Sequence, residues 1–211
     1  MDELDLLKKD WKKQDAEHKK LSVTDIYPML HKKSSSIVKT LLYISIAELL
    51  FWILVNTIPY IVSDSYRSKL ETMYANTGLF TALTIFSYAV ILLFIYLLFK
   101  AYKSISVTDN AKRLMESILK TRKIIKYYVL YNLIMAGISL IIGFYFTFTN
   151  DPKVMSKISH FNDKQMLFLY GFMFITITIF VAIIWLFYKL IYGWLLKRLN
   201  RNYKELKKLE V

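Results

Sequence analysis

Four apolar runs separated by charged segments form the main pattern of the chain. Each run has 23 residues; the last three contain no charged residue, and the first contains only Glu48. The runs are residues 40–62, 77–99, 127–149 and 166–188. A helix needs about 20 apolar residues to cross a hydrocarbon core about 30 Å thick. The pattern therefore predicts four transmembrane helices in an all-α integral membrane protein.

The predicted segments follow from these runs and from the charged stretches between them. Their bounds are 1–36 for a cytosolic amphipathic N-terminal segment, 37–62 for the first span, 63–76 for an extracytoplasmic loop, 77–101 for the second span, 102–126 for a cytosolic basic amphipathic helix, 127–149 for the third span, 150–165 for a second extracytoplasmic loop, 166–192 for the fourth span, and 193–211 for a cytosolic C-terminal helix.

The central charged segment predicts an amphipathic helix that begins at Asp109. Its apolar stripe consists of Ala111, Leu114, Met115, Ile118 and Ile125. Its surrounding cations are Lys112, Arg113, Lys120, Arg122 and Lys123. Such a helix lies in the interface, with its stripe in the headgroup layer and its cations at the phosphates. We expect these cations to contact lipid or a protein partner.

The two ends of the chain also carry apolar residues at helical spacing. Leu4, Leu7 and Trp11 share one face, which predicts contact with the membrane surface or with a partner's groove. A solvated tail explains the same pattern equally well. Beyond the fourth span, a 3–4 spacing continues through Leu196, Leu199, Tyr203, Leu206 and Leu209. It predicts a projecting helical tail or a seam for self-association into a homo-oligomer.

A repeated tetrapeptide indicates an internal duplication. Ser22–Asp25 and Ser106–Asp109 both read Ser-Val-Thr-Asp, at an offset of 84 residues. Each copy is followed by a basic amphipathic segment and then by two apolar runs. We therefore predict two tandem parallel repeats, each an amphipathic interfacial helix plus a transmembrane hairpin. Parallel repeats share one orientation because each contains an even number of spans.

The distribution of charge predicts the topology. The chain has 29 Lys and Arg against 16 Asp and Glu, a formal charge of +13. Of these 29 cations, 24 precede the first apolar run, lie between the second and third runs, or follow the fourth run. The positive-inside rule then places both termini and the central segment in the cytoplasm. This charge serves topology first and attraction to anionic membrane lipids second, so nucleic acid is not an expected partner.

Glu48 is the one charged residue inside the four apolar runs. It follows Lys39 by nine residues, about 13 Å along a helix, and an ionised carboxylate at that depth costs a few kcal/mol or more. Its expected partners are Asn132, Asn56, or a Thr or Tyr hydroxyl. A proton or cation site would explain it, but an inter-helix hydrogen bond that fixes the bundle is favoured.

The sequence lacks the motifs of known catalytic chemistry. It has no cysteine, and its three histidines, His18, His31 and His160, all lie outside the spans. They fall on at least two sides of the membrane, so they do not converge on one metal ion. Phosphate-binding loops and nucleophile elbows are also missing from the sequence. We expect no catalytic residue, no metal site and no cofactor.

Part of the sequence resembles a group of bacterial four-span membrane proteins. The resemblance rests on the run DELDLLKKDWKK, on TDIYPMLHKKSSSIVK and on IAELLFW in the first span. Proteins of this group often carry the label beta-carotene monooxygenase, which implies an iron oxygenase with several histidine ligands. Three histidines outside the spans contradict that label. Members also resemble companions of alternative sigma factors, which implies a regulator in the bacterial cytoplasmic (inner) membrane.

These observations favour a non-enzymatic membrane protein. The leading hypothesis is an anchor or regulator whose basic amphipathic helices bind a cytosolic or membrane partner. The alternative is a small oligomeric channel or transporter that uses Glu48. A membrane-embedded enzyme is the third hypothesis.

Overall fold

The computed structural model describes residues 23–68, 71, 78–107 and 110–209. Five helices contain most of them: α2 Val23–Val62, α4 Gly78–Ser106, α5 Ala111–Asn150, α6 Pro152–Ile158 and α7 Asp163–Leu209. The described part of the chain contains no strand. The prediction of an all-α protein is confirmed. Leu4, Leu7 and Trp11 lie outside the described residues.

Four of the helices are long and apolar enough to cross a membrane, as predicted: α2, α4, α5 and α7. Three of them are much longer than a membrane is thick. Helices α2 and α5 have 40 residues and α7 has 47. At about 1.5 Å per residue they extend about 60 to 70 Å, roughly twice a hydrocarbon core of about 30 Å. Each therefore continues well beyond the membrane as a single helix.

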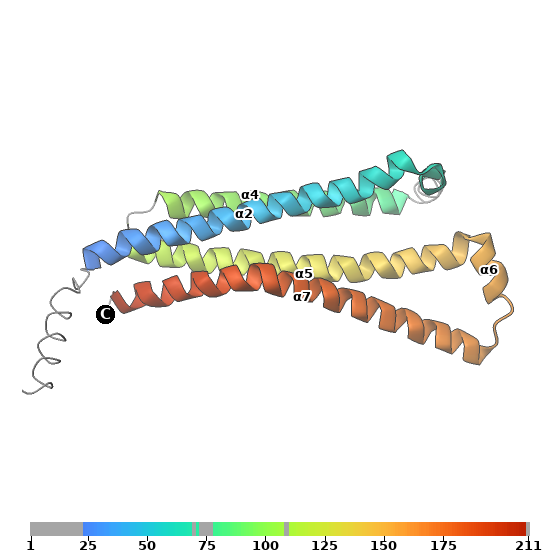
Figure 1. The fold of residues 1–211 in the computed structure, drawn as a ribbon. Coiled ribbons are helices and arrows are strands. Elements are labelled where there is room, and N and C mark those ends of the chain that lie inside the picture. The colour runs from blue at the N-terminus through green and yellow to red at the C-terminus, as the bar shows by residue number, and fades with distance from the viewer. Residues whose placement is uncertain (1–22, 69–70, 72–77, 108–109, 210–211) are drawn as a thin grey trace, which may run out of the picture.

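The four long helices form an up-and-down bundle. Helix α2 packs against α4, α4 against α5, α5 against α7, and α7 against α2, so the four surround one axis in that order. Figure 1 shows the hairpins α2/α4 and α5/α7 lying side by side. Helices α5 and α7 diverge toward α6, the short helix that connects them. The two ends of the described chain, at α2 and α7, lie at the same end of the bundle.

The packed core lies at one end of this bundle. We call residues 23–45, 91–106, 111–128 and 188–209 the basic half, and residues 46–62, 78–90, 129–150 and 163–187 the apolar half. Every described residue that is buried belongs to the basic half. On α7 these are Tyr188, Tyr192, Leu195, Leu199, Asn202 and Leu206. Their 4-3-4-3-4 spacing is that of a heptad seam, in which a and d residues face the neighbouring helices.

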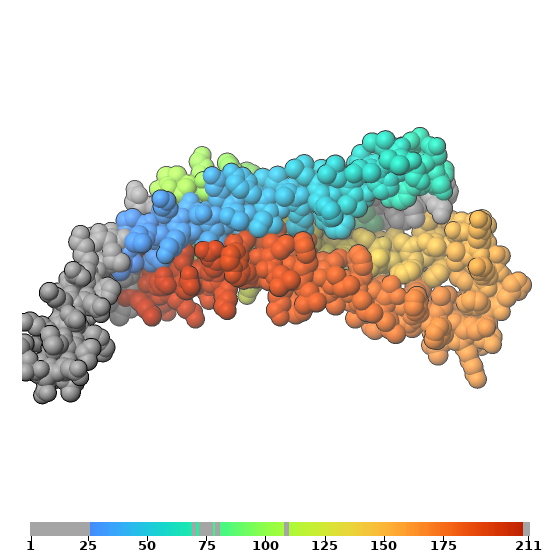
Figure 2. Space-filling model, in the orientation of Figure 1, coloured from blue at the N-terminus to red at the C-terminus, as the bar shows by residue number. Residues whose placement is uncertain are grey.

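The buried residues of α5 have the same heptad spacing as those of α7. On α5 the buried residues include Leu114, Ile118, Thr121, Ile125 and Tyr128. The apolar half is different, because its most apolar stretches on α5 and α7 contain no buried residue. In Figure 2, the blue part of α2 and the red part of α7 are in contact, whereas the orange part of α7 lies apart from α2. Lipid tails or other chains must therefore cover the apolar half.

The structure differs from the predicted surface helix at residues 102–126. Residues 111–126 and the third span form one continuous helix, α5, which begins after the N-cap Asn110 rather than at Asp109. Leu114, Ile118 and Ile125 from the predicted lipid-facing stripe are fully buried. The stripe faces protein because three neighbouring helices extend beyond the membrane beside it. A free surface helix would have no such partner.

The C-terminal seam also packs within the chain. Leu199 and Leu206 are fully buried among the four helices, so this seam is used by the bundle rather than by a second copy. The predicted loop at 150–165 contains α6, whose N-cap Asp151 accepts from the Lys153 backbone N–H at 3.0 Å. Helix α7 then begins at Asp163. Asn162 and Gln165 form a reciprocal capping box there, at 2.9 and 3.0 Å.

Candidate functional site

Glu48 is hydrogen-bonded on both oxygens by tyrosines of α7. The Tyr188 hydroxyl donates to Oε1, and the Tyr192 hydroxyl donates to Oε2 at 2.9 Å. These two tyrosines are four residues apart, so both project from the same side of α7 toward α2. Of the candidate partners expected for Glu48, which were Asn132, Asn56 and Thr or Tyr hydroxyls, the structure brings two Tyr hydroxyls to it. The Tyr-x-x-x-Tyr spacing of Tyr188 and Tyr192 was visible in the sequence, but Tyr127 and Tyr131 have the same spacing, so it did not identify the partners.

The two asparagines proposed as partners do not bind Glu48. Asn132 donates to the Tyr128 carbonyl of its own helix at 2.9 Å. Asn56 donates to the Trp52 carbonyl at 2.7 Å and lies 3.5 Å from the Tyr88 hydroxyl. In a low-dielectric segment a short amide side chain readily bonds the carbonyl one turn back, because this contact needs no other helix. The sequence alone does not show whether such an asparagine bonds the carbonyl one turn back or a side chain on another helix.

Two further residues complete the cluster around Glu48. The Ser45 hydroxyl lies 3.3 Å from the Tyr192 hydroxyl and donates to the Leu41 carbonyl at 3.0 Å. Tyr128 packs edge-on against Tyr188 and Tyr192, with ring centroids 6.4 and 5.9 Å apart. We call Ser45, Glu48, Tyr128, Tyr188 and Tyr192 the Glu48 cluster. It lies where the basic half meets the apolar half, because Ser45, Tyr128 and Tyr188 are the buried residues of α2, α5 and α7 that lie nearest to the apolar half.

Cations over aromatic rings surround the bundle near this level. Lys39 lies over Tyr43 at 5.6 Å, Lys123 over Tyr127 at 5.8 Å, and Lys189 over Trp185 at 4.6 Å. Aromatic residues with neighbouring cations are typical of a membrane–water interface. We call these three pairs the cation–aromatic belt.

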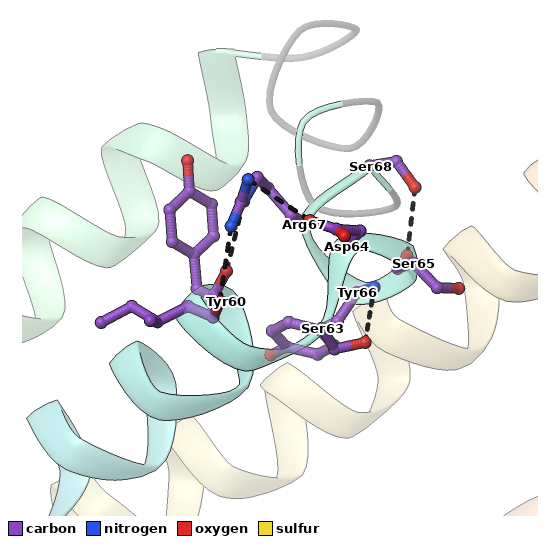
Figure 3. Close-up of polar contacts among 8 residues, drawn as sticks. Tyr60, Ser63, Asp64, Ser65, Tyr66, Arg67 and Ser68 are labelled. Atoms are coloured by element: carbon purple, nitrogen blue, oxygen red, sulfur yellow. Dashed lines mark hydrogen bonds and ion pairs between the residues drawn. The ribbon is translucent and has the colours of Figure 1, made fainter.

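A second interface marker lies at the other end of α2. The Arg67 guanidinium stacks on Tyr60 at 5.4 Å, donates to the Tyr60 carbonyl at 3.3 Å and pairs with Asp64 at 3.5 Å (Figure 3). An arginine here satisfies carbonyls that the helix end leaves free. Tyr43 and Tyr60 are 17 residues apart, about 26 Å along α2, which is close to the thickness of a hydrocarbon core. Along α2, Glu48 lies about 7 to 8 Å from Tyr43 in the direction of Tyr60.

The predicted cations of the central segment lie on the outside of α5. Lys112, Arg113, Lys120 and Lys123 are exposed, and Arg122 is half-buried. On α7, four exposed cations follow one another at 4-3-4 spacing on the side opposite the core. We call Lys197, Arg201, Lys204 and Lys208 the α7 ridge. Among the described residues, its one ion pair joins Arg201 to Glu205 at 3.9 Å, so the other cations of the ridge form no ion pair within that part of the chain.

Two polar contacts fasten the basic half further from the membrane. Asn202 donates to the Ser34 hydroxyl at 3.1 Å, and both side chains are buried in the core. A buried polar pair at core positions of a bundle favours one register of the two helices over others. The His31 ring bonds the Ile105 carbonyl at 2.6 Å, which ties α2 to the end of α4.

The chemistry available to the Glu48 cluster is limited to hydrogen bonding and proton exchange. In the described part of the chain, no group of three His, Cys, Asp or Glu side chains could hold a metal ion. A cavity of about 530 Å³ lies at the start of α7 beside Phe161, Phe168 and Phe172, away from Glu48. It carries no titratable cluster.

The fold and this site define a multi-pass helical membrane protein with an extended, packed basic bundle at one end. The chain belongs to the family described as Domain of unknown function (DUF8845), whose profile matches residues 24–211. The match covers all four long helices to the end of α7, and it begins after the segment that contains Leu4, Leu7 and Trp11. No curated protein and no solved structure matches the chain.

Proposed function

We propose that this protein is a non-enzymatic membrane anchor or regulator, and that the α7 ridge binds an acidic region of a cytosolic protein partner. The observation that carries the proposal is the position of the packed core. The heptad-packed bundle stands outside the apolar half, and most of its cations are exposed and form no ion pair with another described residue. A helix bundle that served only to span the membrane would not need a packed core beyond the membrane.

Distance supports a soluble partner for the α7 ridge rather than lipid alone. Lys197 follows Lys189 of the belt by eight residues, and Lys208 follows it by 19. Along a helix these separations are about 12 and 28 Å. Charges are largely screened beyond about 8 Å at physiological ionic strength. Membrane lipids can therefore engage the belt, but the ridge lies too far out to be held by headgroups.

Topology and duplication belong to the same proposal. The excess of Lys and Arg in the basic half supports cytoplasmic termini in a bacterial inner membrane.

Packing supports the tandem repeat, because a two-fold axis along the bundle would exchange α2/α4 with α5/α7 and α4/α5 with α7/α2. Four pairs of buried residues also repeat at the offset of 84 found for the tetrapeptide: Leu30 with Leu114, Ser34 with Ile118, Ile37 with Thr121, and Leu41 with Ile125.

Glu48 supports a second candidate function, a small oligomeric channel or transporter. A carboxylate inside an apolar segment costs a few kcal/mol and commonly marks a transport pathway. Its two tyrosine donors also suit a structural role, which is why the anchor is preferred. Glu48→Gln separates the two functions, since an anchor carrying it keeps its partner and a transporter loses flux across liposome membranes.

The anchor is tested by crosslinking the protein in its native membrane and identifying what is recovered. The informative variant reverses two ridge charges, Lys197→Glu with Arg201→Glu. The matched control reverses two exposed charges on α6, Lys153→Glu with Lys157→Glu. One cytosolic protein should be recovered with the wild type and the α6 variant and lost with the ridge variant. Equal recovery from all three, or recovery of only the protein itself, contradicts the proposal.

A further inference from the structure

We propose that Glu48 is a reversible proton-binding site, served by a hydroxyl chain that runs from Glu48 through Tyr192 and Ser45 to the Leu41 carbonyl. The proposal is independent of the anchor function. It rests on the geometry of the Glu48 cluster, which provides a hydrogen-bond partner for the carboxyl group in both of its protonation states.

When Glu48 is ionised, the hydroxyl groups that contact it act as hydrogen-bond donors. With Glu48 as carboxylate, Tyr188 donates to one oxygen and Tyr192 to the other, and Ser45 donates to the Leu41 carbonyl. Each of these hydroxyl protons then has an acceptor. No ion pair joins Glu48 to a Lys or Arg among the described residues. The negative charge is therefore held by hydroxyl dipoles, which leaves it free to accept a proton.

The protonated state needs only one hydrogen bond to reverse. When Glu48 takes a proton on Oε2, that O–H can donate to the Tyr192 oxygen, and Tyr192 can then donate to Ser45, 3.3 Å away. Ser45 continues to donate to the Leu41 carbonyl at 3.0 Å, where the chain ends. Tyr188 still donates to Oε1. One proton is gained from water, and no covalent bond between heavy atoms changes.

The groups that face Glu48 from the neighbouring helices do not provide a competing charge. They are Ser45 on α2, Tyr128 on α5, and Tyr188 and Tyr192 on α7. Helix α4 contributes Phe94, whose ring packs edge-on against Tyr128 at 5.4 Å. The nearest cation in sequence, Lys189, lies over the Trp185 ring. Glu48 is therefore the one carboxyl group of the cluster, and no Lys or Arg side chain belongs to it.

Protonation has a mechanical consequence at this position. Hydrogen bonds to an ionised acceptor are roughly twice as strong as neutral ones, so the carboxylate form holds α7 to α2 more firmly than the acid form. The contact lies where the packed basic half gives way to the loosely packed apolar half. Proton uptake thus weakens the α2–α7 contact at the membrane end of the bundle.

The test is an infrared pH titration of the full-length protein in lipid between about pH 4 and pH 9. Because the chain contains 16 Asp and Glu, the signal followed is the part of the carboxylic-acid C=O band that differs between the wild type and Glu48→Gln. Two variants shift the midpoint in opposite directions, each by about one pH unit, the equivalent of one hydrogen bond. Tyr188→Phe removes a donor to the carboxylate, so the midpoint rises. Ser45→Ala removes the acceptor that the protonated state requires, so the midpoint falls.

The matched control is Thr40→Val, which removes another α2 hydroxyl that bonds the carbonyl one turn back, at 3.0 Å, but lies outside the cluster. Its midpoint should equal that of the wild type. Glu48→Gln should lack only the component of the band that belongs to Glu48; should that variant fail to fold, the difference between the wild type and Ser45→Ala assigns this component instead. A wild type without a titrating band overturns the proton site. Shifts of the same sign in both variants overturn the hydroxyl chain.

Discussion

Replacing Leu199 by alanine tests whether the basic half carries the stability of the fold. The Leu199 side chain is fully buried at a core position of the heptad seam. Leucine-to-alanine changes at such sites cost about 2–5 kcal/mol, because contacts are lost and a cavity remains. For a chain of this size, each kcal/mol lowers the midpoint of thermal unfolding by about 2–4 °C. A loss of about 3 kcal/mol therefore predicts a decrease of about 6–12 °C.

Leu190→Ala is the matched control, because it makes the same change in the same helix. The Leu190 side chain is 73% exposed and contributes nothing to the core. The helix-propensity effect of the substitution is equal at both sites, so it cancels from the comparison. Surface substitutions usually change stability by less than about 0.5 kcal/mol, which predicts a shift below about 2 °C.

The assay is thermal unfolding followed by far-ultraviolet circular dichroism, with both variants in the same detergent. A large decrease for Leu199→Ala with little change for Leu190→Ala supports a core that lies outside the apolar half. Equal decreases, or a larger one for Leu190→Ala, would show that the exposed face of α7 is packed in the native protein. The reasoning about the basic half would then be wrong.

Three other substitutions test separate contacts, each by its thermal unfolding midpoint. Ser34→Ala leaves the buried Asn202 amide without its 3.1 Å acceptor and should cost about 1–3 kcal/mol, whereas no loss would mean that the amide is hydrated. Tyr188→Phe removes a hydrogen bond to a carboxylate and should cost about 1.5–3 kcal/mol at neutral pH, with a smaller cost in acid; a cost independent of pH would count against an ionised Glu48. Arg67→Ala removes a cation that interacts with the end of α2 and should cost no more than about 1 kcal/mol, so a larger loss would assign Arg67 a role beyond capping.

The spans were predictable because membrane crossing depends on length and composition alone. Four uninterrupted apolar runs of 23 residues leave no other fold for a chain of this length. The spacing of Leu199 and Leu206 beyond the fourth span was equally legible. It correctly predicted a helix there, but it could not say whether the seam would meet another helix of the same chain or another copy.

The amphipathic segment that contains Leu114 and Ile118 shows why such a pattern is ambiguous. An apolar stripe on a basic helix has the same composition whether it faces lipid headgroups or protein. The choice depends on whether neighbouring helices extend past the membrane beside it. Here α2, α4 and α7 do, and the stripe is buried among them. The length and packing of the neighbouring helices therefore determine what the stripe contacts, and the sequence of the segment itself does not contain that information.

Glu48 marks the same division. Its sequence position alone determined that an embedded carboxylate required a hydrogen-bond donor, because an unpaired charge in hydrocarbon is too costly. Which donor would be used was decided only in three dimensions, where the antiparallel packing of α2 against α7 brings Tyr188 and Tyr192 to both of its oxygens. Asn56 and Asn132, equally polar in the sequence, bond their own helices instead. Composition thus determined that four segments are apolar and long enough to span a membrane, while the register between helices determined where the core lies and which side chains surround Glu48.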